Sequence, residues 1–237
     1  ETEGRTLKAQ REGTSTYVEV KDVPPMGNRR IAFEAGTGRE EAEDFTVCGR
    51  SVETPFYRIA FNEYGQIVDL YDKEYEREIL ASGARANVFQ LFEDKPLDND
   101  AWDIDIFYQE KMREVTELTK FEIIECGALQ LKIHMEWKFM HSSIVQDLIL
   151  YSTSRRIDLY THVDFHEQHQ LLKAAFPSDV RTTYGTYDVQ YGNVRRPNHW
   201  NTSWDQAKFE SVAHRWADLS ERNYGVSLLN DCKYGHD

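Results

Sequence analysis

The sequence predicts an all-β protein: a large antiparallel β-sandwich preceded by a small β segment. Three observations support this fold class: alternation of apolar and polar residues, short turn-rich connections, and few helical stripes. The alternation is clearest in LQLKIHMEWKFM, residues 129–140. A period of two gives a strand one dry and one wet face. Many such strands joined by short turns are typical of an antiparallel sandwich. The apolar positions of this strand are Leu131, Ile133, Met135, Trp137 and Phe139.

The first 50 residues are predicted to form the small β segment and a linker. TYVEV, residues 16–20, has the composition of a strand. Residues 36–51, GTGREEAEDFTVCGRS, combine glycines with clustered acids, which suits a linker. We therefore place a domain boundary near residue 50, with the small segment at 1–50 and the large sandwich at 51–237.

The sandwich is predicted to open with a hairpin. FYRIAFNEYGQIVDLYD, residues 56–72, reads as two strands turning at Tyr64-Gly65, where glycine supplies the positive φ of such turns. Residues 73–80 have spacing that suits one short helical turn.

Further strands are predicted to the end of the sequence. RRIDLYTHVDF, residues 155–165, alternates like residues 129–140. Because a good strand stands directly before Asp237, we expect the sandwich to be truncated there and to continue in a longer protein. The other predicted strands are NVFQLF (87–92), DIDIFY (103–108), IVQDLILY (144–151), YDVQY (187–191), AKFESVAHRW (207–216) and GVSLLND (225–231).

Charge and composition exclude several classes of partner. The formal net charge of −13 disfavours nucleic acids and anionic membrane surfaces, which bind clustered Lys and Arg. No apolar run approaches the roughly 18 residues that span a bilayer. The sequence starts ETEGRTLKAQ, without the apolar core of a secretory signal. Cys48, Cys126 and Cys232 are far apart, so we expect buried or idle free thiols in a reducing, cytoplasmic compartment.

THVDFHEQH, residues 161–169, contains candidate zinc ligands. On a strand His162, Asp164 and His166 would share a face, with His169 nearby. Alternate positions on one strand spread three residues over about 13 Å, however, which a single ion cannot bridge. A solvated polar face is the better interpretation, and no metal site is predicted in this chain.

An acid-rich loop follows the strand at 87–92. Trp102 stands among its acids and offers a ring for a sugar to stack on. A pair of the acids would suit glycoside hydrolysis, but nothing in the sequence selects such a pair. The alternative is a turn-rich connection with outward acids. The acids are Asp94, Asp98, Asp100, Asp103 and Asp105.

RRPNHWNTSWDQAKFE, residues 195–210, is the second candidate loop. Proline and asparagine favour a loop, which would place His199, Trp200 and Asn201 at a rim where ligand contacts concentrate. Alternatively, the tryptophans cap the core.

Four long segments, in one order, resemble glycoside hydrolase family 38, the α-mannosidases, and look closest to the cytosolic and bacterial type. They are ETPFYRIAFNEYGQIVDLYDKEYEREIL (53–80), NVFQLFEDKPLDNDAWDIDIFY (87–108), FHEQHQLLKAAFPSDVRTTYGTYDVQYGNVRRPNHWNTSWDQAKFE (165–210) and AHRWADLSERNYGVSLLNDCKYGHD (213–237). VEVKDVPPMGNRRIAF (18–33) resembles the small β segment that precedes the family's sandwich.

The resemblance implies a retaining α-mannosidase that hydrolyses terminal α-mannosyl linkages. In the family the zinc ion and the nucleophile belong to an N-terminal domain, so no catalytic or metal residue is assigned in this chain. The chain resembles the C-terminal β portion, a supersandwich of the galactose-mutarotase kind. Its expected partners are α-mannoside oligosaccharides and the parent's own N-terminal catalytic domain, and the isolated fragment is expected to be inactive.

Seven loop residues are predicted to contact sugar or the catalytic domain, from residue type and loop position. Two alternatives remain: a free-standing carbohydrate-binding module, and a mutarotase-like enzyme acting on free sugars. The seven residues are Asp100, Trp102, His199, Trp200, Asn201, Asp231 and Lys233.

Overall fold

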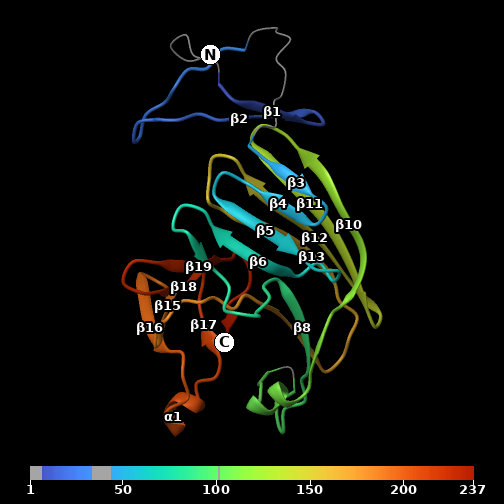
Figure 1. The fold of residues 1–237 in the computed structure, drawn as a ribbon. Helices are drawn as coiled ribbons and strands as arrows, with labels where there is room; N and C mark the ends of the chain where they lie inside the picture. The colour runs from blue at the N-terminus through green and yellow to red at the C-terminus, as the bar shows by residue number, and fades with distance from the viewer. Residues whose placement is uncertain (1–6, 34–43, 101) are drawn as a thin grey trace.

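The computed structural model describes residues 7–33, 44–100 and 102–237. Within these ranges the strands pair antiparallel in several sheets and helix is scarce, so the predicted all-β class is confirmed. Figure 1 shows a small hairpin at one end, a large two-sheet body, and smaller sheets and loops at the opposite end.

The longest strands form a four-stranded sheet in the order β10-β11-β12-β13. The five predicted apolar positions of β11 are all buried, whereas the polar residues between them are partly or fully exposed. The predicted alternation is therefore confirmed. The strands are β10 (Glu117–Cys126), β11 (Gln130–Phe139), β12 (Ser142–Tyr151) and β13 (Ile157–Asp164).

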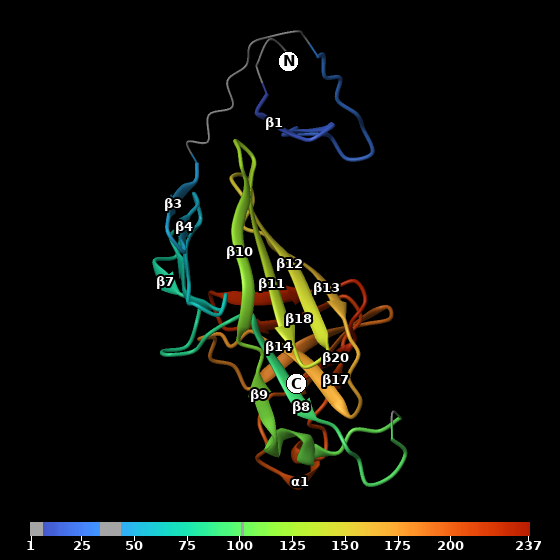
Figure 2. The same ribbon diagram turned by 90° about the vertical axis from the view of Figure 1, so that its right-hand side faces the viewer.

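A five-stranded sheet, β3-β4-β5-β6-β7, packs against the first (Figure 2). The predicted hairpin is its centre, and Gly65 has a φ of 77° in the turn. The predicted boundary near residue 50 lies in the turn between β3 and β4. The predicted linker, 36–51, lies partly outside the described residues, and its remainder includes β3. The strands are β3 (Thr46–Cys48), β4 (Ser51–Glu53), β5 (Tyr57–Phe61), β6 (Ile67–Asp72) and β7 (Arg77–Glu78).

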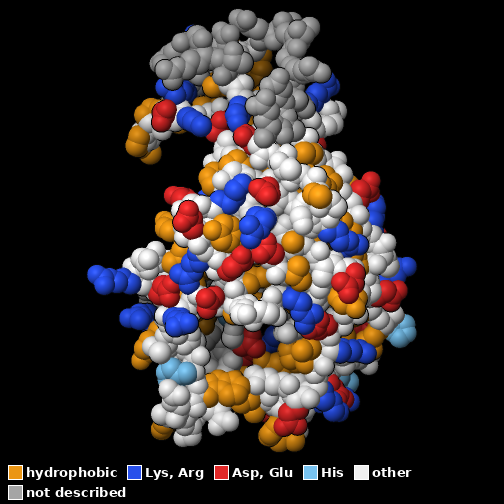
Figure 3. Space-filling model, viewed as in Figure 1, with side chains coloured by type: hydrophobic (Ala, Val, Ile, Leu, Met, Phe, Trp, Pro, Cys, Tyr) orange, Lys and Arg blue, Asp and Glu red, His pale blue; other side chains and the backbone are white. Residues whose placement is uncertain are grey.

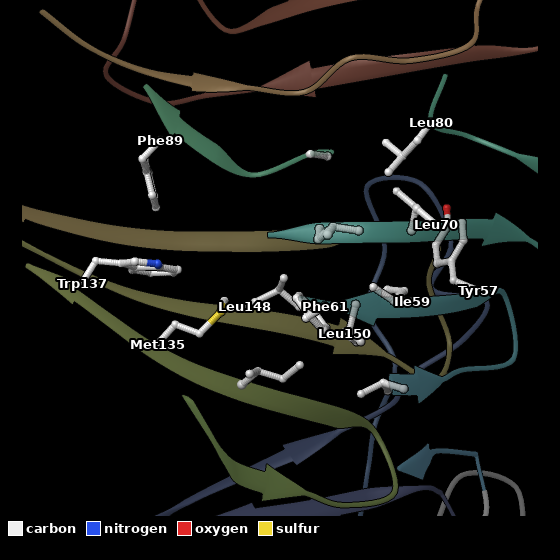
Figure 4. Packing of buried hydrophobic residues seen from close by; sticks show 14 of the residues in the cluster. Tyr57, Ile59, Phe61, Leu70, Leu80, Phe89, Met135, Trp137, Leu148 and Leu150 are labelled. Atoms are coloured by element: carbon white, nitrogen blue, oxygen red, sulfur yellow. The ribbon is translucent and has the colours of Figure 1, made fainter. Parts of the chain in front are cut away.

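The core lies between these sheets, and strand β8 (Val88–Glu93) joins it (Figure 4). The Trp137 indole packs edge-on against Phe89, with ring centroids 5.2 Å apart, and donates a hydrogen bond to the Tyr64 carbonyl at 2.8 Å. A Cβ at Gly65 would come within 2.8 Å of this indole. Glycine is therefore required here both for its φ and for close packing.

Three further sheets, with a short helix, complete the end where the candidate loops lie. Their strand orders are β14-β8-β9, β16-β15-β18-β19 and β17-β20. The elements are β9 (Met112–Glu114), β14 (Gln170–Ala175), β15 (Tyr184–Val189), β16 (Gly192–Pro197), α1 (Ser203–Gln206), β17 (Ser211–Val212), β18 (Trp216–Ser220), β19 (Gly225–Leu229) and β20 (Gly235–His236).

The hairpin of β1 (Ala9–Glu12) and β2 (Ser15–Val18) is attached to the turn between β10 and β11. The buried Gln10 side chain accepts hydrogen bonds from the amides of Leu129 and Gln130 at 2.7 and 2.8 Å. It also donates to the Gln130 carbonyl at 3.1 Å. The Gln10 side chain thus pairs the backbone amides and the carbonyl of a turn far away in the sequence, and these hydrogen bonds fix the small β segment on the sandwich.

Three local predictions are wrong. DIDIFY contains a 3₁₀ helix, η1 (Ile106–Glu110), instead of a strand, because Asp103 and Asp105 accept hydrogen bonds from nearby backbone amides. AKFESVAHRW is not one strand: α1, started by a capping box of Thr202 and Asp205, precedes it, and only β17 and the start of β18 lie within it. Residues 73–80 form a turn and β7 instead of a helical turn, because Asp72 accepts hydrogen bonds from the amides of Glu74 and Tyr75.

His134 on β11 makes the stability of the sheet dependent on pH. Its ring nitrogens lie 3.0 Å from Glu136 and 2.7 Å from Asp147. These hydrogen bonds, with Glu136 first, raise the pKa of His134, although nearby Lys120 opposes them. Because the pKa of His134 is higher in the folded than in the unfolded protein, its hydrogen bonds stabilise the fold fully below the pKa of the unfolded chain, about 6.5. This contribution is lost as the pH rises through the pKa of the folded protein.

We therefore expect His134→Gln to lower the free energy of unfolding by about 0.5–1 kcal/mol more at pH 5.5 than at pH 8. Urea unfolding at the two pH values measures this. The control is His162→Gln, on β13 of the same sheet, whose exposed side chain forms no hydrogen bond within the described ranges. An equal loss at both pH values for His134→Gln would contradict the assignment.

Candidate functional site

A compact cluster of four polar side chains ties the candidate loops together. Lys173, on β14, donates hydrogen bonds to Glu210 at 2.5 Å, Tyr108 at 2.6 Å and Asp237 at 2.9 Å. The Tyr108 hydroxyl in turn lies 2.8 Å from Asp237 and 3.1 Å from Glu210. We call Tyr108, Lys173, Glu210 and Asp237 the loop anchor. Its members come from η1, β14 and the segments flanking β17 and β20.

The electrostatics of the loop anchor favour a charged lysine and a neutral tyrosine. Burial alone would lower the pKa of Lys173, but hydrogen bonds with Asp237, Glu210 and Tyr108 outweigh burial and raise it. Burial raises the pKa of Tyr108 to about 12, Lys173 opposes this, and Asp237 adds to it. The Lys173 ammonium also lies 4.3 Å from the centroid of the Tyr108 ring. The loop anchor is therefore one cation shared by two carboxylates and a phenol.

The acid-rich loop between β8 and η1 projects from this base. Trp102 is 90% exposed, and Asp100 lies 3.4 Å from His169, measured from Oδ2 to Nδ1. Asp105 accepts the Leu97 amide at 2.7 Å and so closes the loop on itself. Burial, and secondly Asp100, raise the pKa of Asp94, whose buried Oδ1 has no hydrogen-bond partner among the described residues.

The second loop, after β16, carries His199, Trp200 and Asn201. The Asn201 amide lies 3.4 Å from His199 Nδ1, and the ring of His199 packs edge-on on Tyr184 with centroids 6.4 Å apart. Trp200 is half exposed, so it does not cap the core. Trp204, on α1, is 78% exposed. The capping box of α1 fixes the loop backbone while its aromatic rings remain in solvent.

Asp231 and Lys233 lie on the third segment, between β19 and β20, and both are exposed. The Lys233 amide donates to Asn230 Oδ1 at 2.8 Å, which forms a turn. Within the part of the chain that the structure describes, no hydrogen bond, ion pair or ring contact joins Asp231 or Lys233 to the other five loop residues that were predicted to contact sugar or the catalytic domain.

The structure thus brings the bases of the three loops together and leaves their tips apart. The first loop ends at Tyr108, the second leads to Glu210, and the third leads to Asp237, all members of the loop anchor. Figures 1 and 2 both place α1 and the loop bearing η1 at the same end of the molecule, and hydrophobic side chains emerge there in Figure 3. The loop anchor was not predicted, although one lysine in the otherwise apolar LLKAA is a sequence signal for a paired, buried charge.

The histidine-rich segment does not form a metal centre. His166 turns onto Asp164 at 3.0 Å, whereas His169 pairs with Asp100 on another loop. Across residues 7–33, 44–100 and 102–237, no group of three or more His, Cys, Asp or Glu side chains is placed to hold a metal ion. The described residues hold no arrangement that would bind the zinc ion, which the family resemblance assigns to the N-terminal domain.

Cys48, Cys126 and Cys232 are free thiols, as predicted, and because all three are exposed, the alternative that they are buried is wrong. In the described ranges, helices are too short to cross a bilayer.

Comparison with known proteins identifies the family. Residues 52–237 match the family model described as glycosyl hydrolases family 38 C-terminal domain. Alpha-mannosidase G of Dictyostelium discoideum is 40% identical over 191 residues, which cover 78% of this chain and 18% of that protein. Alpha-mannosidase 2C1 of Homo sapiens is 37% identical over 189 residues, with the same coverage. The chain thus spans less than a fifth of these relatives.

A solved structure shows the same fold. The alpha-mannosidase from Enterococcus faecalis V583 superposes with a TM-score of 0.67 at 12% identity, covering 97% of this chain and 30% of that one. With the family match over most of the sequence, the conclusion is that the chain belongs to glycosyl hydrolase family 38, and that its residues 52–237 match the C-terminal domain of that family.

Proposed function

We propose that this chain is the C-terminal β part of a retaining α-mannosidase that hydrolyses terminal α-mannosyl linkages. The family match over residues 52–237 carries the proposal, and the relatives named alpha-mannosidase support it. Its substrates would be α-mannoside oligosaccharides. The covalent chemistry, with the zinc ion and the nucleophile, would belong to the parent's N-terminal catalytic domain, so no catalytic residue is assigned here.

The role proposed for this chain is to complete and shield the substrate site. Aromatic residues are enriched where a protein meets a ligand or another domain. Trp102, Trp200 and Trp204 all extend from loops whose bases are fixed by the loop anchor. The three loops carry Asp100, His199, Asn201, Asp231 and Lys233, which would supply hydrogen-bonding groups to a sugar. Closing a site in this way excludes water and holds a sugar in register.

A cytoplasmic location is part of the proposal. Its support is the presence of three exposed, unpaired cysteines. Free thiols persist where glutathione keeps them reduced.

The test compares this chain with the full-length parent protein, using an aryl α-mannoside and added zinc. We expect the full-length protein to release the aryl alcohol with retention of configuration, and the isolated chain to show no turnover above buffer. Turnover by the isolated chain would contradict the assignment of catalysis to the N-terminal domain. Epimerisation of a free sugar anomer by the isolated chain would favour a mutarotase-like enzyme instead. Quenching of tryptophan fluorescence by millimolar mannose, without turnover in the full-length protein, would favour a binding module.

A further inference from the structure

An open cavity lies where the turn before β7 meets the β18–β19 hairpin. Its volume is about 410 Å³, within the range of small-molecule sites. It shares no residue with the loop anchor or with the seven predicted loop residues. The lining residues are Tyr75, Arg155, Ser220, Glu221, Asn223, Tyr224 and Gly225.

One buried carboxylate holds three walls of this cavity. Asp72 is 0% exposed, and its Oδ1 accepts the amides of Glu74 and Tyr75 at 3.0 and 3.2 Å. Its Oδ2 accepts hydrogen bonds from the Arg155 guanidinium and, at 3.1 Å, from the Tyr224 hydroxyl. The turn bearing Tyr75, the arginine and the second tyrosine are therefore fixed before any ligand arrives, which lowers the entropy cost of binding.

The two tyrosines provide an aromatic corner. Tyr75 and Tyr224 pack edge to face with centroids 5.4 Å apart, and Tyr75 remains 54% exposed. The Arg155 guanidinium lies 5.1 Å from the Tyr75 ring centroid, and that of Arg77 lies 4.4 Å from Tyr224. The cations support the rings, and Tyr75 keeps surface available for stacking.

The charges around the cavity are already paired. Arg155 binds Asp72 and Glu74, and Arg77 binds Glu221. An anionic ligand would therefore compete with carboxylates for both guanidinium groups. In contrast, the Asn223 side chain forms no hydrogen bond within the described residues, so its amide is available to a ligand. An aromatic surface, a neutral amide and balanced charge fit a neutral polyhydroxyl ligand.

We infer that this cavity binds one neutral pyranose unit, with Tyr75 stacking on the apolar face of the ring and the Asn223 amide hydrogen-bonding to its hydroxyls. The site would hold a sugar away from the loops that we assign to the substrate site. It does not depend on the proposed function, because none of the loop residues takes part.

The test is titration of the ¹⁵N-labelled chain with free mannose and with glucose, followed by NMR. We expect saturable shifts of the Asn223 side-chain amide and the Tyr75 backbone amide, with a Kd on the order of 1–10 mM for at least one sugar. Tyr75→Ala and Asn223→Ala should each weaken binding about tenfold, whereas Tyr75→Phe, which keeps the ring, should bind as the wild type does.

Two matched variants locate the site. Tyr160→Ala removes a similarly exposed tyrosine of β13, and Trp200→Ala removes a loop aromatic; neither should change these shifts. Binding that is lost only with Trp200→Ala would place the sugar at the loops and overturn the inference. It would also be overturned by absence of saturable shifts, or by inorganic phosphate shifting the same amides. Failure here leaves the turnover test of the full-length protein unaffected.

Discussion

Asp72→Ala is expected to lower the free energy of unfolding by about 3–5 kcal/mol. Asp72 is fully buried and serves Arg155, Tyr224 and two backbone amides at once. Removing the carboxylate leaves a guanidinium without its buried partner and two amides without acceptors, which costs far more than an exposed ion pair. Burial, followed by Asp72, raises the pKa of Tyr224, so its hydroxyl remains a donor to this network.

Urea denaturation measures this effect as a lower midpoint at constant m-value. The matched control is Asp69→Ala on the same strand, β6. Asp69 pairs with Arg58 at 2.9 Å, but the Arg58 side chain is 46% exposed. Loss of this ion pair should therefore lower the free energy of unfolding by less than about 1 kcal/mol. Equal free energies of unfolding for the two variants would show that Asp72 does not hold these segments together.

Lys173→Met in the full-length protein is expected to reduce kcat/KM for an α-mannoside about 100-fold. This prediction rests on the proposed function. Once the Lys173 ammonium is removed, the Glu210 and Asp237 carboxylates face each other and the Tyr108 hydroxyl with no cation between them. The three loop bases would then separate. Lys173 is a positioning residue in this account, because it holds the loops and does not touch the sugar. A displacement of about 1 Å at the loops suffices for such a loss.

The control is Lys111→Met, which removes a lysine that is 73% exposed and pairs with Glu93. It should retain nearly full activity. Near-ultraviolet circular dichroism at the assay temperature must show that Lys173→Met is still folded. Lys173→Arg should restore part of the activity because it restores the charge. Wild-type kcat/KM in folded Lys173→Met would show that the loop anchor has no part in positioning the loops.

Regular strands were predictable because their burial follows the local alternation. β11 and β12 bury every second residue without interruption. β10 was not predicted, although it is equally long. Register shifts between Leu118 and Lys120, and between Ile123 and Glu125, break its alternation, so the sequence pattern loses its period.

The candidate site was predictable only in part, because long-range contacts assemble it. The loop positions of Trp102 and Trp200 follow from local turn residues, and the structure leaves both rings in solvent. Whether they touch sugar or the catalytic domain stays a prediction. The loop anchor has no local signature beyond Lys173, since its partners come from separate segments that only the sheet topology brings together. Likewise, Thr202 and Asp205 have the T-x-x-D spacing of a capping box, which indicates the start of a helix. The apolar residues that follow favoured the prediction of a strand instead.

The loop anchor has a consequence for synthesis on the ribosome. Tyr108 and Asp237 are 129 positions apart, so their hydrogen bond cannot form until that whole span has been translated. At about 5–20 residues per second, this leaves a delay of about 6–26 s. Throughout that interval the tryptophan-bearing loop after β8 protrudes from a nascent chain whose first sheets can already pair. Chaperone binding at this loop should therefore persist through that interval and weaken once Asp237 has emerged.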